Sequence, residues 1–221
     1  MKKDVFCLNV FLVVILIVLL FAFNCKNKYN NIYNIRIKKN HKIVFLGDSL
    51  TEQYRLDEFY RGLPFINSGK GGYTTEDVLN NLEKSVYRYN PTKVFLLIGI
   101  NDLKKQTKND IIYKNIIKIV ESIKENCPNT EVYVESIYPT NNSNDDRISA
   151  QSVSNRSNED IDWINKKLKK YYKDSNVTFI DVNKELKDKN NLLKLDYTVE
   201  GTHITTLGYV RVTSVLIPYL R

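Results

Sequence analysis

The chain of 221 residues has only three cysteines and two histidines, and this scarcity narrows the chemistry open to it. Cys7 and Cys25 fall in or beside a long apolar run near the N-terminus, which leaves Cys127 alone in the rest of the sequence. An intradomain disulfide is therefore excluded. Histidine, cysteine and acidic residues nowhere have the spacing of a metal site, so we expect neither a metal nor another cofactor.

The sequence also lacks the interleaved basic and aromatic residues of a nucleic-acid-binding module, although its formal net charge is +8. We therefore expect no nucleic-acid partner. The excess positive charge fits either solvated lysines along helices or attraction to anionic lipid and cell-wall polymers. No internal repeat is visible, and the residues after position 40 suffice for one domain with a sizeable core.

The longest apolar run, residues 5–23, is interrupted only by Asn9 and follows Lys2 and Lys3. Its length fits a signal peptide or a single spanning helix, because a bilayer core needs roughly 20 residues. The residues before Cys25 make a poor cleavage site. We therefore expect residues 1–25 to be a membrane anchor, 26–40 a polar basic linker and 41–221 the folded domain.

The side of the membrane is harder to assign, because more basic residues follow the apolar run than precede it. Taken literally, the positive-inside rule keeps the domain in the cytoplasm. A short basic start before an apolar core, however, also resembles an export signal. We expect the domain to lie outside the cytoplasm on its anchor, or to be secreted if the N-terminal segment is cleaved.

Beyond residue 40, apolar runs of strand length alternate with stretches of helical periodicity. Strands are predicted at 43–46, 63–66, 94–98, 132–134 and 177–180. Helices are predicted at 74–86 with a threonine cap, at 109–126 with Asn109 as cap, at 157–172 and at 205–217. The alternation predicts an α/β protein with three α/β/α layers and a parallel sheet of about five strands. The polar stretch 139–155 shows no pattern, and is expected to be a binding rim, a lid or plain disorder.

The first predicted strand ends in Gly47-Asp48-Ser49-Leu50. Open α/β sheets place their chemistry at the carboxyl ends of strands, and a glycine there permits a tight turn that exposes the next side chains. An ordinary turn, with Ser49 or Thr51 capping a helix, is the alternative. The choice depends on whether a base, an acid and hydrogen-bond donors lie elsewhere in the chain.

A base and an acid occur together near the C-terminus, in Glu200-Gly201-Thr202-His203. A serine hydroxyl needs an imidazole within hydrogen-bond reach to take its proton, and the imidazole needs a carboxylate to hold its tautomer. His203 can supply the imidazole and Glu200 the carboxylate. The other histidine, His41, precedes the first strand in a basic stretch and is expected at the surface.

Two turns supply donors for the anionic oxygen of an acyl-transfer intermediate. Gly72 lies in a glycine-rich turn after the second predicted strand, where its N–H can approach a substrate closely. Asn101 follows the third strand and can donate through its side-chain amide. Turn chemistry alone also explains each of these residues, but four such elements, each after a strand or on the terminal loop, favour a catalytic site.

These blocks resemble the SGNH hydrolases, also called GDSL esterases and lipases. Gly47-Asp48-Ser49-Leu50 resembles the family's first block, Asn67-x-Gly69-x-x-Gly72 its second, Gly99-x-Asn101-Asp102 its third, and His203 with a preceding acid its fifth. The resemblance covers residues 42–221 and implies a flavodoxin-like SGNH hydrolase fold. It implies Ser49 as nucleophile, His203 as base, and an oxyanion hole formed by the Ser49 N–H, the Gly72 N–H and the Asn101 side chain.

One departure concerns the acid, because the family usually has Asp-x-x-His and this chain has Glu200 at that position. Glutamate serves as the triad acid in other serine hydrolases. The extra methylene shifts the carboxylate, and Asp196 remains an alternative acid.

The resemblance implies an esterase that cleaves acyl esters, short-chain or O-acetyl esters among them, through an acyl-enzyme on Ser49. The substrate is expected to be a small-molecule, glycan or lipid ester. A cell-envelope O-acyltransferase with the same triad is one alternative, and a non-catalytic binding module is another. A nucleotide-binding flavodoxin-like protein is a third, but Gly69-x-Gly71-Gly72 lacks the spacing of a phosphate-binding loop.

Overall fold

The structure, a computed structural model, describes residues 41–220. The predicted anchor (1–25) and linker (26–40) lie outside the described residues, so both stay predictions. Within residues 41–220, no helix combines the length and the apolar character needed to cross a bilayer. The compact unit that contains the sheet includes residues 41–216.

Five parallel strands form one sheet, in the order β2-β1-β3-β4-β5. Along the chain they are β1 (Ile43–Gly47), β2 (Phe65–Gly69), β3 (Lys93–Leu97), β4 (Glu131–Glu135) and β5 (Thr178–Ile180). Every residue of β1 and β3 is buried, which explains why these strands are nearly continuous apolar runs rather than alternating patterns. The predicted parallel sheet is confirmed.

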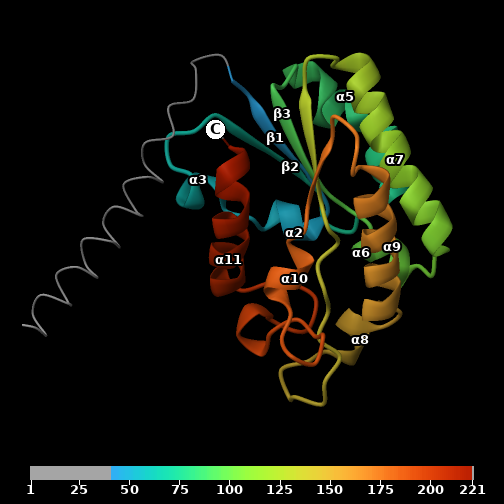
Figure 1. Cartoon of the computed structure of the whole chain (residues 1–221). Coiled ribbons are helices and arrows are strands. Elements are labelled where there is room, and N and C mark those ends of the chain that lie inside the picture. The colour runs from blue at the N-terminus through green and yellow to red at the C-terminus, as the bar shows by residue number, and fades with distance from the viewer. Residues whose placement is uncertain (1–40, 221) are drawn as a thin grey trace, which may run out of the picture. The chain divides into compact units, whose positions relative to one another are not determined.

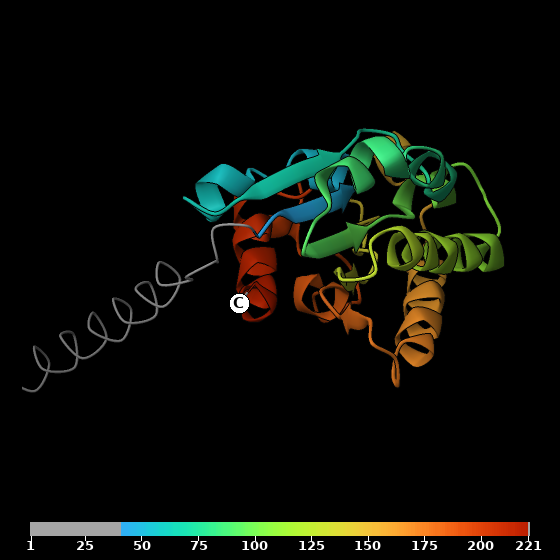
Figure 2. The same cartoon turned by 90° about the horizontal axis from the view of Figure 1, so that it is seen from above.

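Helices cover both faces of the sheet. In chain order they are α2 (Ser49–Glu52), α3 (Leu56–Phe59), α4 (Thr75–Asn80), α5 (Leu82–Ser85), η1 (Tyr87–Tyr89), α6 (Ile100–Lys104), α7 (Asn109–Asn126), α8 (Ala150–Val153), α9 (Asn158–Tyr171), α10 (Asn183–Leu186), η2 (Leu195–Tyr197), α11 (Thr206–Leu216) and η3 (Ile217–Tyr219). Helix α7 packs against α4 and α9 on one side, whereas α10 packs against α11 on the other (Figures 1 and 2). The three-layer α/β/α prediction is therefore confirmed.

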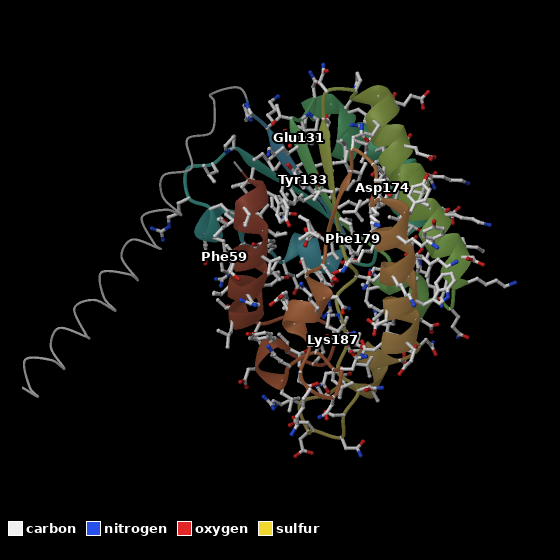
Figure 3. The ribbon with its side chains drawn as sticks, viewed as in Figure 1. Phe59, Glu131, Tyr133, Asp174, Phe179 and Lys187 are labelled. Carbon is white, nitrogen blue, oxygen red and sulfur yellow. The ribbon has the colours of Figure 1, made fainter. Side chains whose placement is uncertain are left out.

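An aromatic stack fixes the register of the three central strands. Phe45 of β1 pairs with Phe95 of β3, which pairs with Tyr133 of β4. The ring centroids lie 4.8 Å and 4.6 Å apart, with 9° between the ring planes at each step. The Tyr133 hydroxyl lies 3.2 Å from the buried Lys93 Nζ and donates to Glu131 (Figure 3). Because the register is fixed here, the carboxyl ends of these strands lie side by side at one edge of the sheet. The candidate site is built on those ends.

Two helix predictions need correction. The apolar periodicity over 74–86 belongs to two short helices, α4 and α5, because the chain turns at Asn81 and again at Val86, after which η1 begins. Thr74 does cap α4, through a capping box with Asp77. Asn109 does not cap α7: it is the first helical residue, the cap is Lys108, and the Asn109 amide donates to Asp160 Oδ1 at 2.5 Å.

The stretch 139–155, predicted to lack a pattern, has a defined conformation. It contains α8, and Thr140 and Asn141 within it are buried. The Thr140 N–H donates to Asn158 Oδ1 at 2.9 Å, and the Asn141 N–H donates to the Gly201 carbonyl oxygen at 2.8 Å. Disorder of this segment is thus excluded, and its contacts lead to the loop that carries His203.

Candidate active site

The site forms where three neighbouring strands end. Ser49 begins α2 directly after β1, Gly72 lies in the turn after β2, and Asn101 lies in α6 after β3. Since β1 lies between β2 and β3 in the sheet, the turns that carry Gly72 and Asn101 flank Ser49. This is the edge at which open parallel sheets hold their ligands.

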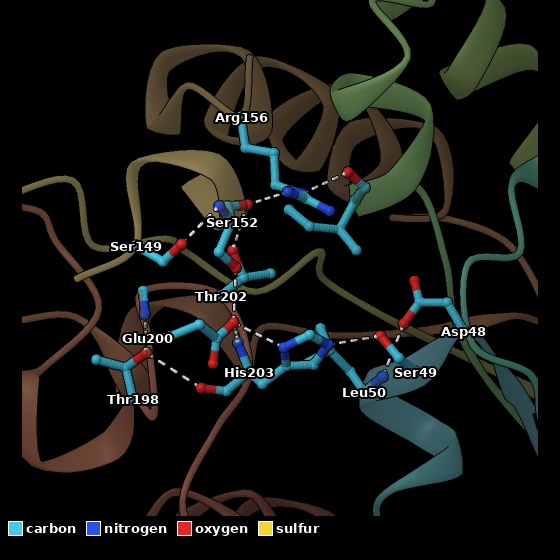
Figure 4. A network of polar contacts seen from close by, with 12 residues as sticks. Asp48, Ser49, Leu50, Ser149, Ser152, Arg156, Thr198, Glu200, Thr202 and His203 are labelled. Carbon is cyan, nitrogen blue, oxygen red and sulfur yellow. Dashed lines mark hydrogen bonds and ion pairs between the residues drawn. The ribbon is translucent and has the colours of Figure 1, made fainter. Parts of the chain in front are cut away.

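Ser49, His203 and Glu200 form one hydrogen-bonded chain (Figure 4). The Ser49 Oγ lies 3.0 Å from His203 Nε2, and His203 Nδ1 lies 2.6 Å from Glu200 Oε1. An ionised carboxylate can only accept a hydrogen bond, so Nδ1 carries the proton and Nε2 presents its lone pair to the serine hydroxyl. The arrangement can take a proton from Ser49 and stabilise the imidazolium that results.

Glu200 is held by three donors on one oxygen. Its Oε1 accepts from His203 Nδ1, from the His203 backbone N–H at 3.0 Å and from Ser152 Oγ at 2.7 Å. Partial burial alone raises the pKa of Glu200, but the hydrogen bonds from Ser152 and His203 outweigh it and leave the pKa below its usual value. These donors favour the ionised form that a triad acid needs.

The other predicted candidates lie elsewhere. Asp196 is part of η2, and its backbone carbonyl oxygen accepts from Thr205 Oγ1 at 2.8 Å. Within the described residues its carboxylate makes no contact with His203, so the geometry favours Glu200 as the acid. His41 is half-buried and precedes β1, so it lies at the opposite end of that strand from Ser49.

The predicted oxyanion donors are available. Within residues 41–220, the backbone N–H groups of Ser49 and Gly72 have no hydrogen-bond partner. Gly72 has a φ of +78°, and a Cβ added there would meet nothing within 4 Å. A positive φ favours glycine for conformational reasons, while the open space beside it leaves room for a substrate.

Asn101 is oriented by contacts on both ends of its amide. Its Nδ2 donates to the Tyr73 carbonyl oxygen at 3.0 Å, and its Oδ1 accepts from Arg156 Nη2 at 3.1 Å. One Nδ2 hydrogen remains for a substrate oxygen, because an amide nitrogen carries two. The contact with Tyr73 also ties Asn101 to the turn that contains Gly72.

The residues that hold the site were largely missed from the sequence. Asn67 and Asp102 lie inside the quoted motifs, and their positions were the only signal. Asn67 Nδ2 donates to the carbonyl oxygens of Thr51 and Tyr54, behind α2, at 2.8 Å and 3.1 Å. Asp102 accepts from the Thr75 N–H and hydroxyl at 2.9 Å and 2.6 Å. Ser152 and Arg156 lie in or beside the segment without a pattern, and no local signal marked them.

Asp48, which precedes Ser49, is a second carboxyl group of the site. It is fully buried; its Oδ1 caps α2 by accepting from the Leu50 N–H at 2.9 Å, while its Oδ2 has no hydrogen-bond partner among residues 41–220. Burial raises the pKa of Asp48 to about 7, against the lowering effect of the Leu50 N–H. Asp48 is thus a helix cap that is reluctant to ionise.

Among the clefts on the surface of residues 41–220, one of about 440 Å³ is lined mainly by polar side chains and has Arg156 and Val153 on its wall. Another, of about 360 Å³, is bordered by Tyr54, Arg55 and Phe65. Neither includes Ser49 or His203 among its lining residues. In the same part of the chain, no group of three or more histidine, cysteine or acidic side chains is arranged to hold a metal ion.

Comparison with known proteins places this geometry in a family. The sequence profile of the GDSL-like lipase/acylhydrolase family matches residues 45–211. A solved structure from Streptococcus pneumonia, described as a candidate platelet activating factor, is 31% identical with a TM-score of 0.76, and the match covers 94% of this chain and 99% of that one. An acetyl xylan esterase, AlAXEase, has a TM-score of 0.67 at 21% identity over 81% of this chain and 100% of its own, which shows the shared fold.

A curated relative, the N-acylneuraminate cytidylyltransferase of Streptococcus agalactiae serotype V, is 27% identical over 180 residues. The match covers 81% of this chain but 38% of that protein, so the chain spans well under half of its length. The family profile extends over most of the described residues and includes Ser49, Gly72, Asn101 and His203. The chain therefore belongs to the GDSL-like lipase/acylhydrolase family.

Proposed function

We propose that the protein is a serine esterase that hydrolyses short-chain acyl esters, O-acetyl esters among them, through an acyl-enzyme on Ser49. The observation that carries this proposal is the hydrogen-bonded chain from Ser49 through His203 to Glu200. Membership of an acylhydrolase family supports the reaction class.

In the proposed reaction the Ser49 Oγ attacks the acyl carbon while His203 Nε2 takes its proton. The oxygen of the tetrahedral intermediate gains negative charge and is bound by the N–H groups of Ser49 and Gly72 and by Asn101 Nδ2. The imidazolium then protonates the leaving alcohol, which leaves the acyl group on Ser49. Water, deprotonated by His203, attacks the acyl-enzyme and releases the carboxylic acid.

The exposure of the site supports a short acyl group. The His203 side chain is 33% exposed, so solvent reaches the base. A long acyl chain gains most of its binding energy from buried apolar area, and a base that solvent reaches favours a small acyl group instead.

The test is an ester panel, with acetyl, butyryl and longer p-nitrophenyl esters and acetylated glycans as substrates. Ser49→Ala should lower kcat by about 10⁶, as loss of a triad nucleophile does elsewhere. A fluorophosphonate probe should label the native protein and leave Ser49→Ala unlabelled. Ser154→Ala is the matched control, since its hydroxyl contacts only the Gln151 carbonyl oxygen of its own helix within the described residues, and it should keep full activity.

Two outcomes would refute the proposal. Labelling or turnover that persists in Ser49→Ala would show that another group is the nucleophile. Transfer of the acyl group to an added sugar acceptor, faster than to water, would make the protein an O-acyltransferase with the same acyl-enzyme.

We also propose that residues 5–23 attach the protein to a membrane, with the catalytic domain outside the cytoplasm. The support is the apolar run and the basic pair before it. Full-length protein should sediment with membranes and be accessible to external protease, whereas protein lacking residues 1–25 should not sediment. A mature form that begins near Cys25 would instead identify a cleaved signal.

A further inference from the structure

Residues 149–156, which we term the brace, contact both halves of the catalytic machinery. The brace begins at Ser149, contains α8 and ends at Arg156. At one end it contacts the loop that carries Glu200 and His203, and at the other it contacts α6, which carries Asn101 (Figure 4). None of the sequence motifs includes it.

At the end of the brace near Glu200, both the side chain and the backbone of Ser152 form hydrogen bonds with the loop that carries Glu200 and His203. Its hydroxyl donates to Glu200 Oε1 at 2.7 Å, and its carbonyl oxygen accepts from Thr202 Oγ1 at 3.0 Å. The Ser149 N–H donates to the Glu200 carbonyl oxygen at 2.9 Å. Because glutamate has one more rotatable bond than aspartate, its carboxylate needs such an additional anchor to keep a single position.

The glycine after Glu200 allows this close packing. Gly201 has a φ of +107°, and a Cβ there would lie 2.4 Å from Val153 Cγ1 and 2.6 Å from the Asn141 carbonyl oxygen. Any side chain at this position would therefore push the loop away from the brace. The contact between the brace and the loop therefore requires glycine on the loop side as well as the packing residues of the brace.

At the other end, Arg156 sets the direction of the Asn101 amide. Arg156 is 6% exposed, and its Nε donates to the Ile100 carbonyl oxygen at 3.1 Å while Nη2 donates to Asn101 Oδ1 at 3.1 Å. Arginine has donors only, so the amide oxygen must face it and the nitrogen must face Tyr73 and the substrate side. Its Nη1 also donates to the Ser152 carbonyl oxygen, so that a hydrogen bond within the brace links Arg156 to Ser152.

We propose that the brace positions the two charge-stabilising elements of the site together, with Ser152 holding Glu200 and Arg156 holding Asn101. Neither residue contacts the Ser49 hydroxyl, so both act as positioning residues. The kinetic tests of this inference rest on the proposed esterase function. A spectroscopic test does not depend on turnover.

The first experiment removes the hydroxyl at the acid end. Ser152→Ala should lower kcat about 10-fold to 10²-fold with little change in KM, because a displaced catalytic group costs that much. Ser152→Thr, which keeps a hydroxyl, should recover most of the loss. Ser154→Ala, the same change on the same helix, should leave kcat unchanged. Equal kcat in Ser152→Ala and Ser154→Ala would overturn the role of Ser152.

The second experiment alters the oxyanion end. Arg156→Lys keeps the charge but not the planar fork, so Asn101 loses its fixed direction and kcat should fall by about 10², again with KM nearly constant. Arg147→Lys is the control, since Arg147 forms an exposed pair with Asp145. A loss seen only in KM would place Arg156 in substrate binding and overturn the inference for it.

The independent readout is the NMR signal of the imidazole ring protons at fixed pH, which is tractable because the chain has only two histidines. His41→Asn assigns the two sets of signals. The His203 ring signals should shift in Ser152→Ala, return in Ser152→Thr and stay unaltered in Ser154→Ala. If no ester is turned over but this pattern holds, the proposed function fails while the positioning of Glu200 stands. Unshifted His203 signals in Ser152→Ala would overturn the positioning role of Ser152.

Discussion

Two turns each bring a carboxyl group close to the Ser49–His203 pair, and the surroundings shift the pKa values of the two groups in opposite directions. The turn after β1 places Asp48 next to Ser49, fully buried, with one oxygen on the Leu50 N–H and the other without a hydrogen-bond partner in the described part of the chain. The terminal loop places Glu200 against the base, partly exposed, with three donors on one oxygen. Burial raises the pKa of Asp48 to about 7, and hydrogen bonds lower that of Glu200.

This difference assigns the two roles. Burial with a single donor disfavours the charged carboxylate, whereas several donors favour it. Only a carboxylate that stays ionised can stabilise an imidazolium next to it, so Glu200 fits the triad acid. Asp48 serves the turn instead, by satisfying an N–H at the start of α2. Proximity to the reacting groups alone would not have separated them.

Among changes to the acidic side chains, the largest expected effect comes from removing the charge of Glu200. Glu200→Gln keeps the shape and should lower kcat by about 10⁴, because the imidazolium loses its partner and the tautomer is no longer fixed. Steady-state kinetics on p-nitrophenyl acetate measure the loss. The same amide change at the other carboxyl, Asp48→Asn, is the comparison and should cost far less in kcat. Similar losses in both would erase the distinction drawn between the two turns.

A smaller effect is expected from shortening the acid to the residue that is usual in the family. Glu200→Asp retracts the carboxylate by about 1.5 Å, one carbon–carbon bond. The loop cannot easily follow, since Gly201 is already packed on Val153 and Asn141. We expect kcat to fall about 10-fold to 10²-fold, and Ser152→Ala to add little on top, because the shorter side chain no longer reaches that hydroxyl. Wild-type kcat in Glu200→Asp would show that the loop moves freely.

Asp48 should affect stability more than rate. A buried carboxyl with a raised pKa holds its proton in the folded state and releases it on unfolding, so stability falls as pH rises from about 4 to 7. A shift from 3.8 to about 7 corresponds to about 4 kcal/mol. Asp48→Asn should remove this part of the pH dependence, seen by denaturant unfolding at pH 4 and pH 8. Asp57→Asn, at an exposed position, should leave the difference between the two pH values as it is in the native protein.

The smallest expected effect belongs to Asp196, the alternative acid. Asp196→Asn should change kcat less than about twofold, because the hydrogen bond described for Asp196 is made by its backbone oxygen to Thr205 and surface substitutions are usually mild. A crippled Asp196→Asn beside an active Glu200→Gln would transfer the acid role to Asp196.

The sheet and the contact between Ser49 and His203 were predictable from the sequence because their signals are local. Buried parallel strands are apolar runs, and the chemistry of an α/β protein lies where those runs end. Each predicted residue needed only its strand and its turn. The broken helix at 74–86 was not predictable in this way, since α4 and α5 share one apolar periodicity.

The segment 139–156, which includes the brace, escaped prediction because its order comes from distant partners. Asn141 Nδ2 donates to the carbonyl oxygen of Leu193, 52 residues away, and Ser152 reaches Glu200 across 48 residues. Single hydrogen bonds between polar residues leave no periodicity in a sequence. A polar stretch without a pattern is therefore compatible with a well-ordered segment when buried amides such as Asn158 accept its backbone N–H groups.

His203 follows Ser49 by 154 positions in the chain, and this also separates the two in time. At about 5–20 residues per second, a ribosome adds the base roughly 8–30 s after the nucleophile. During that interval the nascent chain carries a serine with no partner, and the acid arrives only just before the base. Ester hydrolysis is accordingly a readout of the completed chain: in refolding, its recovery should trail the circular dichroism of the central strands.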